Sequence, residues 1–171
     1  SEQLSNQSIA MGHSLLSTES VFAWATYKCN FQRQGFNPYE FSAPPYSLKW
    51  TYQGNRPLLS PVLADDSLFV PSEDGAVYRI DARTGIFKSR IDLDEPIIAI
   101  HLHSSYLIIV TVDEVVIYDR TSQFFLWRKP VDITGLASVV ANEDTVYYLN
   151  GSYLISANIA TGNENWKLTS Q

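Results

Sequence analysis

The sequence predicts an all-β protein made of repeated four-stranded antiparallel blades, and two observations carry this prediction. The 171 residues form short runs rich in Val, Ile, Leu and Tyr that are separated by turn residues, a pattern typical of strands. One polar turn also occurs three times, as IDARTG at 80–85, YDRTSQ at 118–123 and NIATG at 158–162. A motif that returns at a constant spacing indicates a repeat fold.

The spacing of this turn defines the repeat. Its first residue is Asp81, Asp119 or Asn158, and these lie 38 and 39 residues apart. A hydroxyl residue follows three positions later in each copy, namely Thr84, Ser122 and Thr161. Two copies have a Gly four positions later, Gly85 and Gly162, and two have a Trp eight positions later, Trp127 and Trp166. The first copy has Ser89 at the Trp position, but Trp50 stands 39 residues upstream of it. The Trp position therefore repeats as well.

The residue types explain the turn. A carboxylate or amide at the first position can accept hydrogen bonds from backbone N–H groups two or three residues later. The Thr or Ser hydroxyl adds a second local bond, and Gly tolerates the positive φ that ends the turn. Three matching turns with a matching Trp position favour one repeated unit over three unrelated hairpins.

The strands follow in order between these turns. Expected runs include PLLSPVLA, SLFVPS and AVYRI in the first unit, PIIAIHL, YLIIVTV, EVVIY and FFLWRK in the second, and LASVVA, TVYYL, YLISAN and NWKLT in the third. A period near 39 residues with four strands indicates a β-propeller blade. We expect blades at about 56–94, 95–132 and 133–171, preceded by an arm at 24–55 that ends in the outer strand of a closing blade around Trp50. Residues 1–23 are a Ser- and Gln-rich lead-in that suits a flexible arm, a short helix or a docked strand.

The pattern Asp-x-x-Thr-Gly-x-x-x-Trp resembles the tryptophan-docking repeat of PQQ-like (quinoprotein-type) β-propellers, and the resemblance covers residues 24–171. It implies that Trp50, Trp127 and Trp166 lie between neighbouring blades. It also implies that the residues of the turns take part in docking the blades, here Asp81, Thr84, Gly85, Asp119, Thr161 and Gly162. Since Ser89 departs from the pattern, we expect the blade that ends there to dock more loosely. The same repeat serves dehydrogenases, outer-membrane assembly scaffolds and sensor ectodomains.

Three blades and one strand do not close a ring, because propellers have about four to eight blades. An open arc would expose sheet faces and edges that other chains can pair with. Three readings stay open: this sequence is part of a propeller of about seven or eight blades, the chain is completed by self-association or by a partner, or it forms an unusual small closed ring.

Composition excludes several classes of function. The net charge of −6 and the absence of a Lys/Arg cluster disfavour nucleic acid as a partner. Cys29 is the only cysteine, so the chain has no intrachain disulfide and no cysteine-based zinc or iron–sulfur site. No apolar run reaches the roughly 18 residues of a membrane span.

The candidates for metal or catalytic chemistry are weak. His101 and His103 could share a strand face, yet the sequence offers no third zinc ligand nearby, so a polar strand face is the simpler interpretation. Acidic pairs such as Asp65-Asp66 and Asp113-Glu114 fall on hairpin tips and fit no EF-hand spacing. We find no familiar catalytic motif, and no match to the calcium ligands or vicinal Cys pair of quinoprotein enzymes. The prediction is a protein that is not an enzyme and has no cofactor and no metal site.

The predicted function is a rigid interaction platform or scaffold subunit in a multi-protein assembly. The expected partners are other proteins or the remaining blades of a longer parent chain. Aromatic side chains of the leading arm are candidate contacts because exposed aromatics anchor interfaces: Phe31, Phe36, Tyr39, Phe41 and Tyr46. The alternative is a ligand-sensing ectodomain or a fragment of a PQQ-dependent dehydrogenase. The resemblance favours a periplasmic or otherwise extracytoplasmic location, with the cytoplasm as the alternative.

Overall fold

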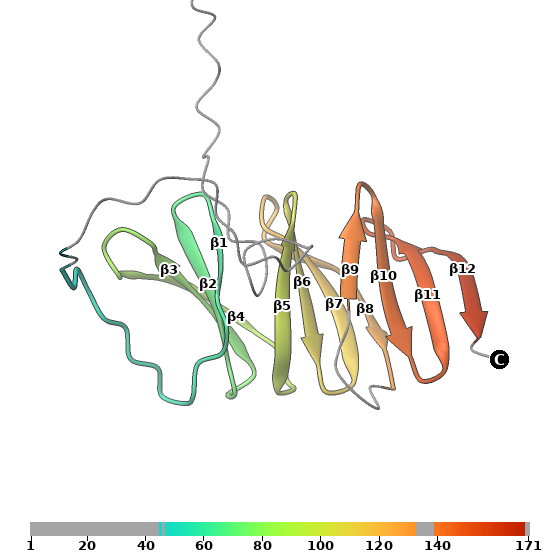
Figure 1. The fold of residues 1–171 in the computed structure, drawn as a ribbon, viewed down its shortest axis with the longest axis horizontal. Coiled ribbons are helices and arrows are strands. Elements are labelled where there is room, and N and C mark those ends of the chain that lie inside the picture. The colour runs from blue at the N-terminus through green and yellow to red at the C-terminus, as the bar shows by residue number, and fades with distance from the viewer. Residues whose placement is uncertain (1–44, 46, 133–138, 170–171) are drawn as a thin grey trace, which may run out of the picture.

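The fold consists of three antiparallel four-stranded sheets that stand side by side (Figure 1). It was obtained as a computed structural model that describes residues 45, 47–132 and 139–169. All regular structure in these residues is β-strand, which confirms the predicted fold class. Each sheet corresponds to one copy of the sequence repeat, and we call the sheets the first, second and third blade.

The strands of each blade pair in the order in which they occur in the sequence. The first blade contains β1 (Val62–Ala64), β2 (Ser67–Ser72), β3 (Ala76–Asp81) and β4 (Phe87–Asp92). The second contains β5 (Ile97–His103), β6 (Tyr106–Thr111), β7 (Glu114–Asp119) and β8 (Phe124–Pro130). The third contains β9 (Val139–Asn142), β10 (Thr145–Asn150), β11 (Tyr153–Asn158) and β12 (Glu164–Thr169). Strand β5 lies next to both β1 and β9, so the first strands of the three blades are neighbours.

The register is the same in every blade, so equivalent residues can be compared directly. In the second blade, Trp127 of β8 pairs across the sheet with Ile117, which in turn pairs with Ile108. The equivalent row in the first blade is Ser89, Arg79 and Phe69, and in the third blade it is Trp166, Ser156 and Tyr147.

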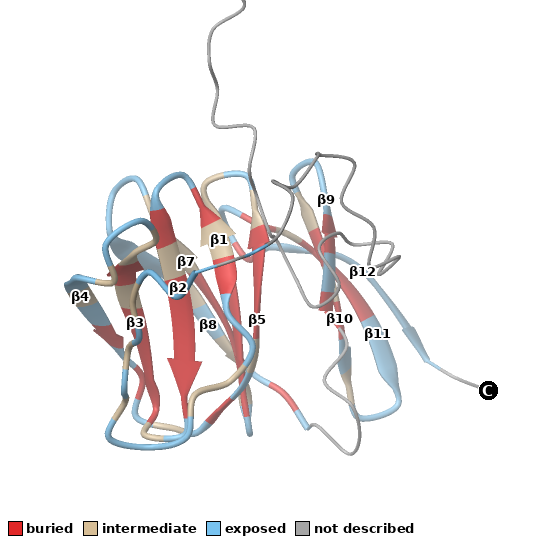
Figure 2. Ribbon diagram, turned by 60° about the vertical axis from the view of Figure 1, so that its left-hand side comes forward, coloured by how far each residue is buried: buried red, intermediate tan, exposed pale blue. Residues whose placement is uncertain are grey.

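Two apolar cores fill the spaces between successive blades. The first core joins Phe69 and Val77 to Leu107 and Val116 of the second blade. The second core joins Ile108 and Val115 of the second blade to side chains of the third. Figure 2 shows these buried segments along the middle strands, whereas β12 is exposed throughout.

The outward face of the first blade is covered by the segment that leads into it. Trp50, Tyr52 and Leu58 pack against a third apolar cluster that includes Val70 and Tyr78. The sequence predicts an outer strand around Trp50, but residues 47–57 form no regular strand, and Leu58 makes only an isolated bridge to Ser72. A strand requires a neighbour, and the described residues offer this segment none on its own sheet.

Candidate functional site

The recurring turn has the same hydrogen bonds in all three blades. Asp81 Oδ1 accepts from the backbone N–H groups of Arg83 at 3.1 Å and Thr84 at 2.8 Å, and from the Thr84 hydroxyl at 2.8 Å. Asp119 and Asn158 accept the equivalent bonds in the other two blades. The turn ends in residues with positive φ, at 75° for Gly85, 63° for Gln123 and 71° for Gly162. An amide and a carboxylate thus build the same turn.

The two carboxylates in these turns are held in their charged form. The pKa of Asp81 is well below its ordinary value because Lys88 lies 2.9 Å away and the Thr84 hydroxyl and N–H also donate to it. The pKa of Asp119 is lowered by the N–H of Thr121 and by the hydroxyl and N–H of Ser122. Hydrogen bonds to the ionised oxygen favour ionisation, so both turns are weakened by acid.

Two indoles pack against the turn of the blade that follows them in the sequence. The Trp50 Nε1–H donates to the carbonyl oxygen of Ala82 at 3.1 Å, and a Cβ on Gly85 would lie 2.7 Å from the ring. Likewise, the Trp127 Nε1–H donates to the carbonyl oxygen of Ile159 at 2.7 Å, and a Cβ on Gly162 would lie 2.9 Å from that ring. Gly is therefore required twice over, since it takes a positive φ and leaves room for the indole.

The contact between the first and second blades is made differently. Ser89 stands where the indole would be, and Gln123 stands where its Gly would be. Arg120 instead reaches back from the second blade: its Nη1 lies 3.1 Å from Asp65 Oδ2 and its guanidinium carbon lies 5.9 Å from the centre of the Phe69 ring. At this boundary an arginine of the turn contacts the preceding blade, whereas at the next boundary an indole of the preceding blade contacts the turn.

Arg120 is held on both sides of the blade boundary. Its Nη2 donates to the Ser104 carbonyl at 2.7 Å within its own blade, and its side chain is mostly buried. Arg79 approaches the same Phe69 ring at 5.8 Å. The boundary therefore combines an ion pair with two guanidinium groups near one aromatic ring. The strength of these contacts depends on how the guanidinium groups are placed relative to the carboxylate and the ring.

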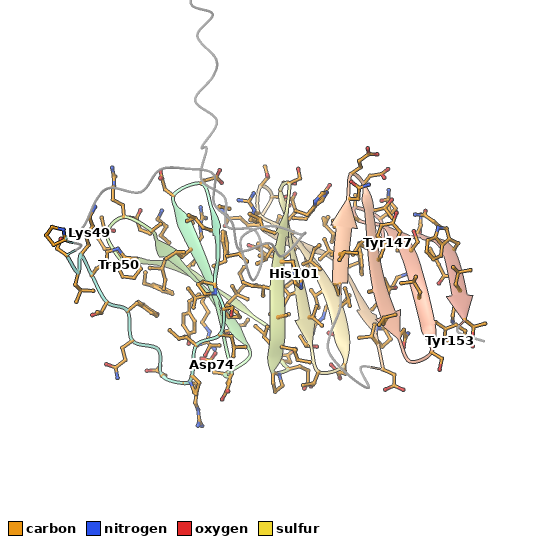
Figure 3. All side chains as sticks on the ribbon, in the orientation of Figure 1. Lys49, Trp50, Asp74, His101, Tyr147 and Tyr153 are labelled. Atoms are coloured by element: carbon orange, nitrogen blue, oxygen red, sulfur yellow. The ribbon has the colours of Figure 1, made fainter. Side chains whose placement is uncertain are left out.

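Trp166 lies on the last described strand, where no further blade covers it. Its side chain is 41% exposed, and its ring packs against Tyr147 at 5.9 Å. Figure 3 shows Trp50 and Lys49 at one end of the arc and Tyr147 and Tyr153 at the other. Of the three predicted docking indoles, the structure places two against a turn and leaves the third open.

Exposed apolar residues also lie where the outer strands of the first two blades begin. We call this set of residues the rim patch: Ile86 and Phe87 of the first blade, and Phe124, Phe125 and Leu126 of the second. The equivalent positions of the third blade are polar: Asn163, Glu164 and Asn165. Phe87 packs against Tyr78 and Phe125 against Tyr118, with ring centroids 6.4 and 5.4 Å apart, so both rings have a fixed position.

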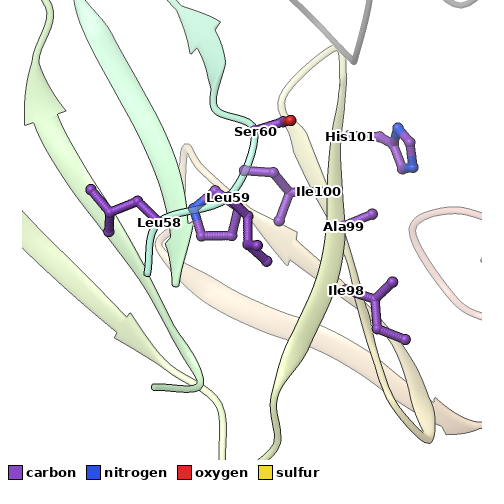
Figure 4. Close-up of a pocket in the computed structure, with 8 residues that line it drawn as sticks. Leu58, Leu59, Ser60, Ile98, Ala99, Ile100 and His101 are labelled. Carbon is purple, nitrogen blue, oxygen red and sulfur yellow. The ribbon is translucent and has the colours of Figure 1, made fainter. Parts of the chain in front are cut away.

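A groove lies beside the first strands (Figure 4), with a volume of about 590 Å³ and walls from Leu58, Pro71, Ile98, Ile100 and His101. His101 is buried, and His103 Nε2 forms a hydrogen bond of 2.7 Å with the Glu143 carbonyl oxygen. Within residues 45, 47–132 and 139–169, no group of three His, Cys, Asp or Glu side chains is placed to hold a metal ion. The same residues include no helix long and apolar enough to cross a membrane.

Acidic side chains at the tips have structural contacts. Asp65 pairs with Arg120, and Asp74 lies against Tyr78 and Arg90. Burial would raise the pKa of Asp74, but hydrogen bonds from the Tyr78 and Ser72 hydroxyls and the charge of Arg90 lower it overall. The hydrogen bond to Asp74 also raises the pKa of Tyr78.

The contribution of sequence reasoning to these sites is uneven. The predicted contact residues Phe31, Phe36, Tyr39, Phe41 and Tyr46 lie outside the described residues. The rim patch and the role of Arg120 were not predicted. A signal for the rim patch existed, because aligning the repeats puts apolar residues after two turns only. For Arg120 the alignment shows only that Ser89 meets the one turn that lacks Gly, and not which residue makes the contact instead.

No family model matches the sequence, and no curated protein matches it. Solved structures do. BamB from Moraxella catarrhalis is 18% identical with a TM-score of 0.58, covering 70% of this chain and 38% of that one. A europium-containing methanol dehydrogenase is 17% identical with a TM-score of 0.58, covering 73% and 27%. The computationally designed Ika4 protein is 12% identical with a TM-score of 0.60, covering 75% and 82%.

The chain spans less than half the length of the first two of these structures. At such identities the likeness concerns the fold alone, because one fold carries many functions. Together with the three sheets and their common register, it shows that the chain is built as blades of a β-propeller.

Proposed function

We propose that this protein is a non-catalytic, PQQ-like β-propeller that serves as a rigid interaction platform in a multi-protein assembly. The observation that carries the proposal is the rim patch. Phe124 is 71% exposed and Ile86 is 65% exposed, on the outer strands of two neighbouring blades. Exposed aromatic residues on a rigid scaffold are favourable interface anchors, since little conformational entropy is lost when they bind.

The third blade supports this interpretation. It forms the same turn and the same strands with Asn163, Glu164 and Asn165 at the positions of the patch. The fold therefore does not require apolar residues there. Their presence on two adjacent blades is better explained by a partner than by the stability of the blade, because several exposed large apolar residues near one another in the fold mark interaction sites more often than single ones do.

The experiment is site-specific photo-crosslinking in the source cell. A photoreactive amino acid at Phe124 should form a crosslink to another protein, whereas the same group at Asn163, the equivalent position on the third blade, should not. The same protein should be captured from Phe87. Equal capture from Asn163, or capture from neither patch position, would contradict the proposal.

A second candidate is a ligand-sensing ectodomain or a fragment of a PQQ-dependent dehydrogenase. It is favoured by the similarity to a methanol dehydrogenase and by the groove beside the first strands. Reconstitution of the full chain with pyrroloquinoline quinone and calcium, followed by assay of alcohol and sugar oxidation, separates the two. Oxidation would replace the platform proposal; the platform proposal expects none and includes no cofactor.

Similarity to BamB also supports a protein-interaction role and an extracytoplasmic location as part of the proposal. Fractionation of the source cells, with detection of the chain in the periplasmic or external fraction, tests this location. Recovery with the cytoplasmic fraction would favour the alternative.

A further inference from the structure

The hairpin tip between β10 and β11 is fastened to the segment that leads into the third blade, and we call its three hydrogen bonds the tip latch. Asn150 Oδ1 accepts from the backbone N–H of Asp132 at 2.8 Å, and Asn150 Nδ2 donates to the carbonyl oxygen of Pro130 at 3.4 Å. The Gly151 N–H donates to the carbonyl oxygen of Asp132 at 2.8 Å. The latch therefore engages both ends of the Asn150 amide and the backbone N–H that follows it.

The other two blades fasten the same tip without a side-chain amide. In the first blade, the Glu73 N–H and the Ser72 hydroxyl donate to the carbonyl oxygen of Pro57 at 3.1 and 3.3 Å. In the second blade, the Val112 N–H donates to the carbonyl oxygen of Pro96 at 3.2 Å. The fold therefore does not require Asn at this position, and an Asn followed by Gly here is particular to the third blade.

Asn followed by Gly is a chemically reactive pair. The Gly151 backbone nitrogen, once it loses its proton, can attack Cγ of Asn150. The bond from Cγ to Nδ2 breaks, the nitrogen leaves as ammonia, and a five-membered succinimide ring remains. Water then opens the ring to Asp or to isoaspartate, in which the chain continues through the former side chain. Gly favours the attack because it has no Cβ to crowd the approach and its backbone reaches more conformations.

The closed latch opposes each part of this reaction. The proton that Gly151 must lose is donated to the Asp132 carbonyl oxygen, and the Asn150 amide that must turn towards Gly151 is held at both ends. The Asp132 carboxylate is close as well, since its Oδ2 lies 3.8 Å from where a Cβ on Gly151 would be. A negative charge beside an N–H group disfavours loss of its proton. The reaction therefore requires the latch to open first.

The product cannot restore the latch. After deamidation, the side chain at position 150 has no N–H to donate to the Pro130 carbonyl oxygen and carries a negative charge near the Asp132 carboxylate. Two like charges at short range repel each other. Isoaspartate also adds one carbon atom to the backbone of a two-residue turn. Conversion is therefore a one-way change in how the third blade is fastened.

We propose that Asn150 is a site of spontaneous deamidation under the control of the tip latch. The site is protected while the latch is closed, reacts when the latch opens, and after conversion leaves the tip of the third blade unfastened. This inference does not depend on the platform proposal, because Asn150 lies outside the rim patch and the tests below use no partner.

Peptide mass spectrometry of the full chain, incubated at mildly alkaline pH in water enriched in heavy oxygen, measures the conversion. Opening two hydrogen bonds of ordinary strength makes the reactive state about 30-fold rarer, so Asn150 should convert about 30-fold more slowly in the folded chain than in guanidinium chloride. Asn142 and Asn163 are the internal controls because a Glu follows each of them. Equal rates with and without denaturant, or conversion of Asn150 no faster than the controls in denaturant, would overturn the proposal.

Asn150→Asp imitates one product and tests whether the latch survives conversion. Asn150→Ser is the matched control, because Ser72 ends β2 as Asn150 ends β10. Amide hydrogen exchange at Gly151, measured by NMR, should be at least about fivefold faster in Asn150→Asp than in the natural chain, and faster than in Asn150→Ser. If Asn150→Asp does not fold, naturally converted chain separated by ion exchange takes its place in the same measurement. Exchange at the natural rate, or at the rate of Asn150→Ser, would overturn the proposal.

Discussion

Replacing Trp127 with Ala should strongly destabilise the protein, whereas the same change at Trp166 should not. A fully buried Trp removes about 150–250 Å² from water, which at about 25 cal/mol per Å² corresponds to about 4–6 kcal/mol. Trp127 is partly buried and packs against the second core, and its N–H bond to Ile159 adds about 1 kcal/mol. We therefore expect a loss of about 3–5 kcal/mol, the range measured for such truncations in cores.

Trp166 provides the matched control because it occupies the same position in the next blade. Its contact with Tyr147 and its exposure predict a loss of about 1 kcal/mol in the present chain. Trp127→Phe separates the ring from the hydrogen bond, and we expect about 1–2 kcal/mol for a change that leaves the Ile159 carbonyl without its donor.

Urea unfolding followed by circular dichroism measures these losses. With a slope of about 2 kcal/mol per M, Trp127→Ala should lower the midpoint by about 2 M and Trp166→Ala by about 0.5 M. Similar losses at the two positions would refute the reasoning, since they would mean that docking onto the next turn adds little. A Trp127→Phe variant as unstable as Trp127→Ala would assign the effect to the hydrogen bond alone.

Three further predictions concern the turns and the blade boundary. Gly162→Ala and Gly151→Ala both place a Cβ at positive φ, at a cost of about 1–2 kcal/mol, but only at Gly162 would the Cβ meet an indole; at Gly151 the nearest atom is 3.8 Å away. Gly162→Ala should therefore lower the free energy of unfolding by about 1–3 kcal/mol more than Gly151→Ala, as measured by urea unfolding. Equal losses at the two positions would contradict the contact between Trp127 and Gly162. Stability should decline below about pH 4, because a carboxyl whose folded pKa is depressed contributes stability above its unfolded pKa of about 3.9, which is lost as the pH falls towards the folded value. Asp81→Asn should keep the turn, because Asn158 forms the same turn in the third blade, and it should make the urea midpoint less dependent on acid pH. If the pH dependence is unchanged, groups other than Asp81 are responsible for it. Arg120→Ala should lower the free energy of unfolding by about 1–3 kcal/mol, and this loss should shrink at high salt. The control is Arg128→Ala, whose partner Glu114 lies on the same sheet and whose loss should be less than about 1 kcal/mol. A larger loss for Arg128→Ala than for Arg120→Ala would exclude Arg120 as a link between blades.

The boundary between the first and second blades shows how far pattern reasoning extends. The absence of Trp at Ser89 and of Gly at Gln123 is visible in the sequence, and it predicts looser docking there. The replacement by Arg120 and Asp65 is not visible, because the two residues are 55 positions apart in sequence and nothing local to either indicates the other. Whether the arginine contact is weaker than an indole contact stays a prediction, which the Arg120 and Trp127 variants together measure.

By itself the sequence determined the repeat: its period, the strands between turns, and the residue types that close each turn. These are local properties, since an Asx side chain bonds to N–H groups two or three residues away and strand alternation has a period of two. Only the tertiary structure decided which indole meets which Gly, that Arg120 links the first two blades where the Trp is missing, and that one face of the third blade is not covered by any other described residue. Those outcomes depend on contacts between residues about 30 to 55 positions apart, and the geometry of stacked sheets, rather than any local preference, brings such residues together.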